Sequence, residues 1–476
     1  MKQEFHAHPF MMLKLMKPFR FVLILPVLKG LLQYWISRKI TGVLGLEIVA
    51  VSVITLIAAL RCRSFRLIIS KQNVTVQIGV ILRSRAVIPI EKLSSVRAMQ
   101  NPLDAVFHAV TMQIHTEAGL QGRADFEYKL RFRDSERFAE LIYGNVERTT
   151  VKFSAIKVAI MAATTSSAVT GMIIAVPVIH QTGRLLGLAI DRMLLDEINT
   201  VSERFQTVFP PIVNAVTLIF LLSYAVAFVY SLLKTINFTL ATDETTMEVK
   251  SGFFVRRRAF FKKSSVNDVK IDQTPLMRLF RRYVMKVSVG GYGDTRSEEA
   301  VLVPSARRNE IQQQFSTFFP FLKADGPAIH AAPDGRTLNR FLFWPKLYMT
   351  ALFTVSVIPA VFFEEFRSLI LFLNLVTAVI IVYHAYLCVF EWKFGSVKFG
   401  DNLAAKSVKG FRTTELYCPK ENIGEIKIMR FPPDLRRGTC SIRATVRSEA
   451  ADHIRVRHID YAAVCQGIAE IYGIRL

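Results

Sequence analysis

The chain has 476 residues, of which 51% are hydrophobic and 21% charged, and its mean hydropathy is +0.31. This composition is apolar for a water-soluble enzyme and favours a membrane protein. The 61 Lys and Arg residues exceed the 38 Asp and Glu residues, which gives a net charge of +23. The five cysteines include no C-x-x-C pair, which argues against a disulfide framework and a structural zinc site.

Six charge-poor segments approach the length of about 20 residues that a helix needs to cross a bilayer. A long stretch with the alternating pattern of strands follows each pair of segments. We therefore expect a membrane protein of class α plus β, with six transmembrane helices in three hairpins. Each hairpin should precede a β-barrel or sandwich domain with a C-terminal capping helix. The three pairs are 21–36 with 42–60, 158–180 with 205–233, and 341–363 with 368–390.

These segments predict the order of the domains. Lys and Arg gather at the domain-side ends of the segments, which predicts a plasma-membrane protein with its N-terminus and its domains in the cytoplasm. The pattern of residues 181–204 predicts an amphipathic helix on the outer surface. In chain order we expect a tail at 1–20, a hairpin at 21–60, a domain at 61–150, a hairpin at 155–233, a domain at 234–325, a linker at 326–340, a hairpin at 341–390 and a diverged domain at 391–476.

The soluble stretches repeat. An offset of 173 residues places Gly79 on Gly252, and it also places Gln100 on Gln273 and Pro102 on Pro275. Each Gly follows an alternating apolar segment, which predicts a hairpin turn. A third, diverged copy keeps Gly410 and Pro433 at the same spacing but lacks the Gln-x-Pro-Leu signature.

A hairpin of spans, then strand, Gly and strand, then a Pro-containing segment such as Val96–Leu103, resembles the bacterial pleckstrin-homology-like (bPH2) membrane protein family. Three such units resemble its three-repeat members. The resemblance implies a bent PH-like sandwich, a plasma-membrane location and no catalytic residues. It also implies a protein partner, a shorter single-repeat PH-like membrane relative.

The sequence contains no nucleotide-binding, metalloprotease or hydrolase motif, so we expect neither an enzyme nor a cofactor or metal. The best candidate site is basic. Its residues suit anionic lipid headgroups or a partner protein, although a basic rim needed only for topology explains them equally well. Basic and aromatic residues do not interleave on a reading surface, so nucleic acid is not an expected partner. The candidate residues are Arg83, Arg85, Arg256, Arg257, Arg258, Lys262, Lys263, Arg281 and Arg282.

Lys29 and Glu47 are charges inside the first predicted hairpin. If that hairpin turns at Arg38, the two side chains lie at the same depth and form an intramembrane pair. Snorkelling of Lys29 without contact, or an ion or proton path, are the alternatives.

Together these features predict a non-enzymatic polytopic membrane protein whose three cytoplasmic domains form a scaffold or a subunit of a membrane complex. The alternative is a transport, export or lipid-handling component that the domains regulate.

Overall fold

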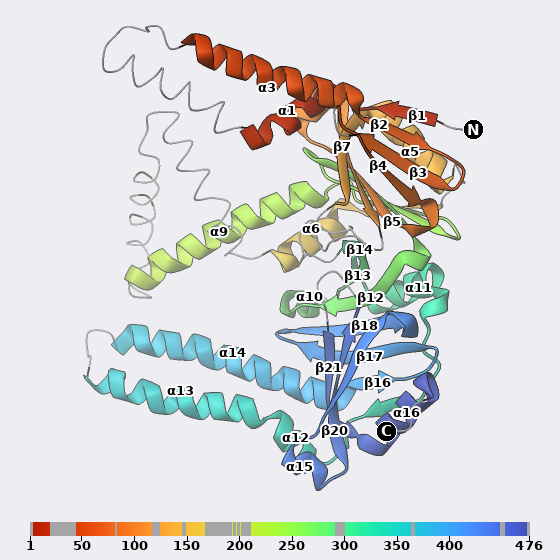
Figure 1. Cartoon of the computed structure of the whole chain (residues 1–476). Helices are drawn as coiled ribbons and strands as arrows, with labels where there is room; N and C mark the ends of the chain where they lie inside the picture. The colour runs from red at the N-terminus through yellow and green to blue at the C-terminus, as the bar shows by residue number, and fades with distance from the viewer. Residues whose placement is uncertain are drawn as a thin grey trace. The chain divides into compact units, whose positions relative to one another are not determined.

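The computed structural model describes residues 3–19, 44–80, 83–116, 124–144, 149–166, 193, 197, 200, 211–290, 300–362, 367–447 and 453–473 (Figure 1). The described residues form two compact units. The first unit takes them from Met1–Val151, Thr239–Ser265 and Val289–Arg296. The second takes them from Lys152–Phe238, Val266–Ser288 and Ser297–Leu476.

The expectation of six transmembrane helices in three hairpins is wrong. The structure is built largely from four β-sheets. Among the described helices, two are long and apolar enough to cross a bilayer, over Thr217–Thr235 and Leu373–Phe394. Only 11% and 17% of these two windows are buried, so they are not core helices, and they suggest a membrane association.

Hydropathy misled the prediction because an apolar run can cover a sheet instead of facing lipid. The beginning of the expected span at 158–180 belongs to the short helix α6 (Ala155–Thr165), whose Met161 is buried against Met277 and Val284. The expected span at 21–36 lies outside the described residues. So do residues 167–180 and 205–210, and all of the expected outer helix except Met193, Glu197 and Thr200.

The first unit contains two antiparallel sheets. One has the strand order β1-β2-β3-β4, and the other has the order β7-β6-β5-β11-β10-β9-β8. Repeat one supplies β1 (Gln3–His6), β2 (Arg66–Ile69), β3 (Asn73–Ile78), β4 (Ser84–Pro89), β5 (Leu93–Gln100), β6 (Ala109–Thr116) and β7 (Phe126–Arg131). Repeat two adds β8 (Thr149–Lys152), β9 (Thr239–Thr242), β10 (Thr246–Ser251) and β11 (Arg256–Lys262).

Helices complete repeat one. They are α1 (Met11–Met16), η1 (Lys17–Phe19), α3 (Leu44–Ser64), η2 (Ile90–Lys92), α4 (Pro102–Val106) and α5 (Phe132–Tyr143). The alternating apolar residues of the strands point inward and meet α5 in one core, which includes Leu67, Met112, Leu130 and Phe138. This core also contains Phe260 of β11, a residue of the second repeat.

The second unit contains the other two sheets, with the orders β14-β13-β12-β18-β17-β16-β15 and β19-β20-β21. Repeat two supplies α9 (Pro211–Thr235), β12 (Val266–Gln273), α10 (Pro275–Leu279), β13 (Tyr283–Val289), β14 (Ala300–Ala306), α11 (Arg308–Phe318) and η4 (Pro320–Leu322). The short helix η3 (Lys263–Ser265) of the same repeat belongs to the first unit.

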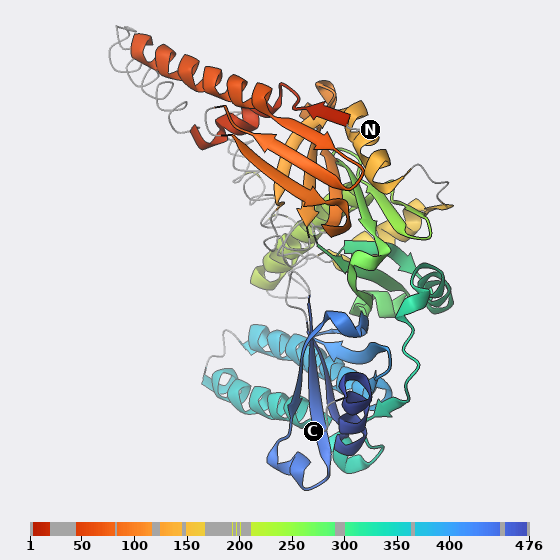
Figure 2. The ribbon, with the colours of Figure 1, turned by 45° about the vertical axis from the view of Figure 1, so that its right-hand side comes forward.

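Repeat three lies wholly within this unit, and Figure 2 shows α16 beside its long strands. Its strands are β15 (Ala328–His330), β16 (Ser396–Lys398), β17 (Asn402–Lys409), β18 (Arg412–Pro419), β19 (Ile423–Met429), β20 (Thr439–Val446) and β21 (His453–Asp460). Its helices are α12 (Gly335–Phe341), α13 (Phe343–Phe362), α14 (Arg367–Phe394), η6 (Lys420–Asn422), α15 (Pro432–Leu435) and α16 (Tyr461–Tyr472).

In each repeat, long helical segments are inserted between the first and second strands. α3 precedes β2, α9 precedes β9, and α14 precedes β16, whereas β1, β8 and β15 come before these helices in the chain. The first strands therefore arise from residues that the sequence assigned to the N-terminal tail, to the end of the first domain and to the linker.

The inserted helix α14 is fixed to its sheets by a buried ion pair. The Glu391 carboxylate is almost fully buried and accepts hydrogen bonds from Nε of Arg457, at 3.2 and 3.1 Å, and from the Ser407 hydroxyl at 3.1 Å. Burial would lower the pKa of Arg457, but the adjacent carboxylate outweighs burial and raises it. The pair thus joins the end of α14 to β17 and β21.

We expect Glu391→Gln to destabilise the second unit by about 3 kcal/mol, because it leaves the Arg457 charge without its buried counterion. Thermal unfolding of the purified full-length protein in detergent measures the change. The matched control is Glu421→Gln, which removes an exposed carboxylate from the same repeat. Equal melting temperatures for the two variants would contradict the structural role of the pair.

Candidate functional site

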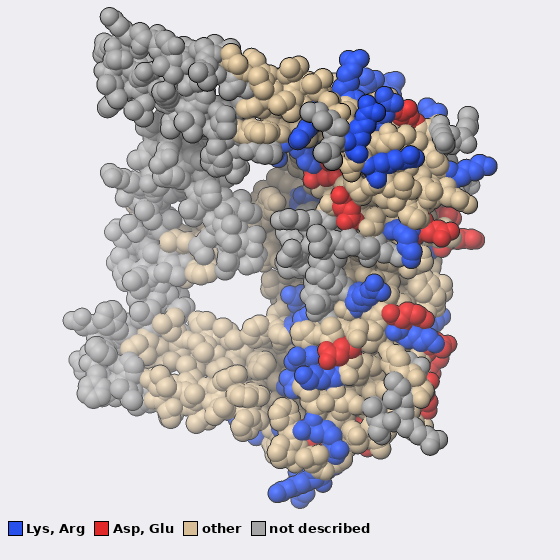
Figure 3. Space-filling model, viewed as in Figure 1, with Lys and Arg blue, Asp and Glu red and all other residues tan. Residues whose placement is uncertain are grey.

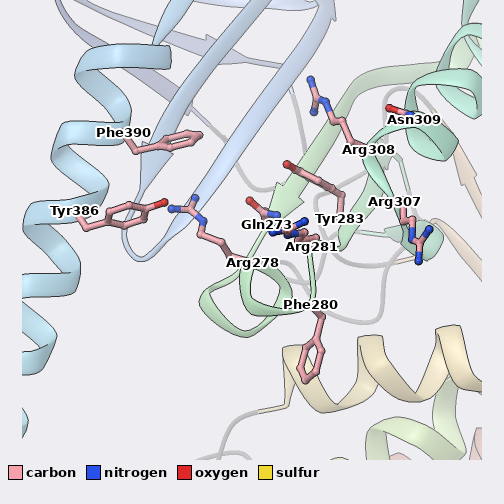
Figure 4. Close-up of a pocket in the computed structure, with 10 residues that line it drawn as sticks. All are labelled: Gln273, Arg278, Phe280, Arg281, Tyr283, Arg307, Arg308, Asn309, Tyr386 and Phe390. Atoms are coloured by element: carbon pink, nitrogen blue, oxygen red, sulfur yellow. The ribbon is translucent and has the colours of Figure 1, made fainter.

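A basic pocket of the second unit has a volume of about 850 Å³. It lies between the α10–β13 loop, the start of α11, and one side of α14 (Figure 4). Its lining includes four arginines and no carboxylate. The lining residues are Gln273, Arg278, Phe280, Arg281, Tyr283, Arg307, Arg308, Asn309, Tyr386 and Phe390.

Arg278 projects from α10 toward α14. Its guanidinium lies 4.7 Å from the ring centre of Phe390 and 5.3 Å from that of Tyr386, and its Nη2 donates to the Thr413 hydroxyl at 3.2 Å. Its Nη1 is buried without a hydrogen-bond partner among the described residues. The side chain is therefore held in place by aromatic rings and a hydroxyl, and one of its donor groups has no described acceptor.

The other arginines of the pocket differ in their partners. Arg308 lies 2.8 Å from the carboxylate of Glu415, which raises the arginine's pKa although burial would lower it. The two groups are close but are not aligned as a hydrogen bond. Arg281 and Arg307 are exposed, and within the described parts of the chain no carboxylate pairs with either of them. The pocket therefore keeps a net positive charge.

The loop that carries Arg278 and Arg281 is defined by the repeat signature. The Gln273 side-chain amide donates to the Arg282 carbonyl at 3.2 Å, as the Gln100 amide does to the Ala109 carbonyl at 3.3 Å in repeat one. Pro275 occupies the first turn of α10, where a missing N–H costs nothing. The glutamine thus closes the loop between two strands and has a structural role.

The remaining signature residues are also structural. Gly79, Gly252 and Gly410 have φ values of 120°, 100° and 61°, which suit hairpin turns. Pro102 begins α4. In the third repeat Pro432 comes first in α15 and Pro433 second.

The nine predicted basic residues are divided between the two units. Seven of them lie in the first unit, and Arg281 and Arg282 lie in the second. Arg83 and Arg85 are exposed at and beside the start of β4, and Arg256 is exposed at the start of β11. Of the nine, only Arg281 lines the pocket.

Several of the other predicted residues have partners within the chain. Arg258 binds Glu136 at 2.7 Å and Glu248 at 3.1 Å. Lys262 donates to a backbone carbonyl at 2.9 Å. Burial lowers the pKa of Lys263, whereas nearby carboxylates raise it, and burial dominates. Arg257 also has interactions within the chain.

Sequence analysis missed Arg278, Arg307, Arg308 and Tyr386. Arg307 and Arg308 are adjacent in the sequence at the start of the capping helix α11, and two neighbouring cations at a helix start were an available signal. Tyr386 offered none, because it lies within a predicted span. Of the expected intramembrane pair, Lys29 lies outside the described residues, and for Glu47 only its backbone position in α3 is described.

Comparison with known proteins defines the family. Residues 21–146 and 192–317 each match the bacterial PH domain, and together they cover more than half of the chain. The two matches fall on the first and second repeats, as the internal repeat requires. No curated protein and no solved structure matches the chain. The chain belongs to the bacterial PH domain family, with its domain present as an internal repeat.

Proposed function

We propose that this chain is a membrane-associated, non-enzymatic scaffold whose arginine-lined pocket binds the anionic headgroup of a phospholipid. The bacterial PH domain family is generally non-enzymatic, which supports a binding role. The observation that carries the proposal is a pocket with four arginines and no carboxylate, directly beside an apolar helix with an exposed surface. The transport alternative required a path through six spans, and the described residues hold two candidate spans.

The chemistry of the pocket fits a phosphate group. Arginine presents several N–H donors in a planar arrangement that matches phosphate oxygens. Arg281 and Arg307 have no described carboxylate partner, and Nη1 of Arg278 has no described acceptor. A bound phosphate would supply acceptors to these donors and compensate the excess charge of the pocket.

The surroundings of the pocket favour a lipid. Leu375, Val379 and Val382 of α14 are 64%, 62% and 59% exposed, so the helix offers apolar surface to acyl chains. On the face shown in Figure 3, α14 is free of blue and red side chains along most of its length, and Lys and Arg gather where it meets the sheets. Tyr386 and Phe390 belong to both the helix and the pocket. A headgroup in the pocket can therefore have its tails along the same helix.

Removal of the pocket charges tests the proposal. We expect the triple variant Arg278→Gln, Arg281→Gly, Arg307→Gln to bind phosphatidylglycerol at least about tenfold more weakly, because each cation near an anionic lipid contributes about 1 kcal/mol. Native mass spectrometry of the detergent-solubilised protein, titrated with phosphatidylglycerol or phosphatidylcholine, measures the affinity.

The matched control removes three cations outside the pocket, Arg83, Arg85 and Arg256, each changed to Gln. Equal losses in both triple variants would contradict a specific site. Comparable binding of the two lipids, or inorganic phosphate that competes at the same concentration as the lipid, would contradict lipid recognition.

Arg281 offers a second prediction because its φ is 50°, which is unfavourable for residues with a Cβ. Gly438 occupies the same place in repeat three with a φ of 64°. We expect Arg281→Gly to raise the free energy of unfolding by up to about 1 kcal/mol while weakening lipid binding, and Arg281→Ala to weaken binding without that gain.

Chemical denaturation in detergent, measured beside the lipid titration, checks both effects. His108, at the same loop position in repeat one with a φ of 53°, is the control. His108→Gly should stabilise the first unit and leave lipid binding unchanged. A loss of stability in Arg281→Gly would show that the strain argument is wrong.

A further inference from the structure

Successive repeats are joined within this chain by one recurring strand pair. β5 of repeat one pairs antiparallel with β11 of repeat two, and β12 of repeat two pairs antiparallel with β18 of repeat three. The short helices η2, η3 and η6 occupy the same place in the three repeats. η2 lies between β4 and β5, η3 between β11 and β12, and η6 between β18 and β19. Phe260 and Tyr417 hold the same position before the short helix of their repeats, and Val96 and Val269 hold the same position after it. Phe260 lies opposite Val96 and Tyr417 lies opposite Val269, so the strand register is the same at both junctions.

At both junctions an aromatic residue of the following repeat packs against the preceding repeat, with Phe260 buried and Tyr417 half-buried. Phe260 is 5% exposed and enters the core of repeat one, where its ring stacks on Tyr143 with centroids 5.7 Å apart. Tyr417 contacts Phe315 of α11 with ring centroids 4.4 Å apart, and burial raises its pKa to about 12. The following repeat therefore closes the core of the preceding repeat.

Two strands that correspond to these junction strands have no partner at their outer edge among the described residues. β4 corresponds to β11 and β18, and β19 corresponds to β5 and β12, but β4 and β19 are both end strands of their sheets. Val87 of β4, the counterpart of Phe260 and Tyr417, is 51% exposed. Ile426 of β19, the counterpart of Val96 and Val269, is half-buried, although those two residues are fully buried.

The charged residues of β19 show the same contrast. Asp268 and Lys270 of β12 are buried at its junction with β18. Glu425 and Lys427 occupy the same places in β19 and are exposed. β19 thus has the side-chain pattern of a junction strand but lacks the neighbouring strand.

We propose that β19 of one chain pairs with β4 of a second copy, in the register of the internal junctions. Val87 of the second copy then lies opposite Ile426 and extends the core of repeat three. There it meets Tyr472, the last residue of α16, as Phe260 meets Tyr143, the last residue of α5. Tyr472 is 39% exposed in the single chain.

These edges favour a second copy of this chain as the partner, because each chain carries both strands of the proposed junction, β4 and β19. A proline in β4 does not prevent the pairing, since Pro89 has its counterpart in Pro419 of the paired strand β18. The interface is heterologous, so it generates open chains or closed rings of copies. The proposal does not depend on lipid binding, since it uses neither the pocket nor α14.

Cysteine cross-linking tests the pairing and its register. Full-length Val87→Cys protein is mixed with Ile426→Cys protein in nanodiscs and oxidised, and a second mixture pairs Ala86→Cys with Lys427→Cys. Residues directly opposite each other have Cβ atoms about 4.5 to 5.5 Å apart, so both mixtures should form cross-linked dimers. A mixture of Val87→Cys with Lys427→Cys places the thiols on opposite faces, and it should react at least about tenfold more slowly.

Wild-type protein and each single variant alone are the controls for the native cysteines, four of which are buried. Equal cross-linking of the in-register and shifted mixtures, or no cross-linking in either, would overturn the proposal. So would capture of β4 by a different protein, such as a single-repeat PH-like relative added to the same mixture, in preference to the second copy.

Light scattering of the solubilised protein supplies a test without cross-linking. Val87→Asp buries a charge in the interface and should weaken association at least about tenfold. Val80→Asp is the matched control, since Val80 is 41% exposed in the turn before β4. Equal association of both variants and the wild type, or a wild type that stays monomeric at all concentrations, would contradict the inference.

Discussion

Backbone hydrogen bonding between successive repeats is the interaction on which this structure depends. A strand at a sheet edge exposes a row of unpaired N–H and C=O groups, which must find partners. Here β11 satisfies β5, and β18 satisfies β12, so that two sheets of seven strands each combine two repeats. Repeats two and three also each give an aromatic side chain, Phe260 and Tyr417, to the repeat before them, which makes the repeats interdependent.

The same architecture positions the candidate ligand site. The inserted helix α14 ends against β17 and β21 through Glu391, and its Tyr386 and Phe390 hold Arg278 of the preceding repeat. Because β12 and β18 are hydrogen-bonded, α10 of repeat two lies next to α14 of repeat three. The arginine pocket is thus a product of the junction between the repeats, because repeat two supplies its arginines and repeat three supplies Tyr386 and Phe390.

Sequence analysis predicted the features that arise from local rules. The Gly turns, the alternating strands and the fixed offset of two repeats follow from residue types at short spacing. Sequence analysis failed where an apolar segment had two possible neighbours, as in α6, whose buried face covers a sheet. It could not distinguish the basic residues from one another, because Arg258 and Arg281 are alike in sequence, whereas in the folded chain Arg258 meets the carboxylates of Glu136 and Glu248.

The sequence by itself determined the family, the repeat and the turns, because these depend on glycine, proline and alternation within a few residues. Only the tertiary structure decided which strand edges pair, which apolar helices keep an exposed surface and which arginines share a pocket. Strand pairing uses backbone groups that every residue carries, so no motif records the partner. The net charge of a site likewise depends on side chains that folding brings together from remote parts of the chain.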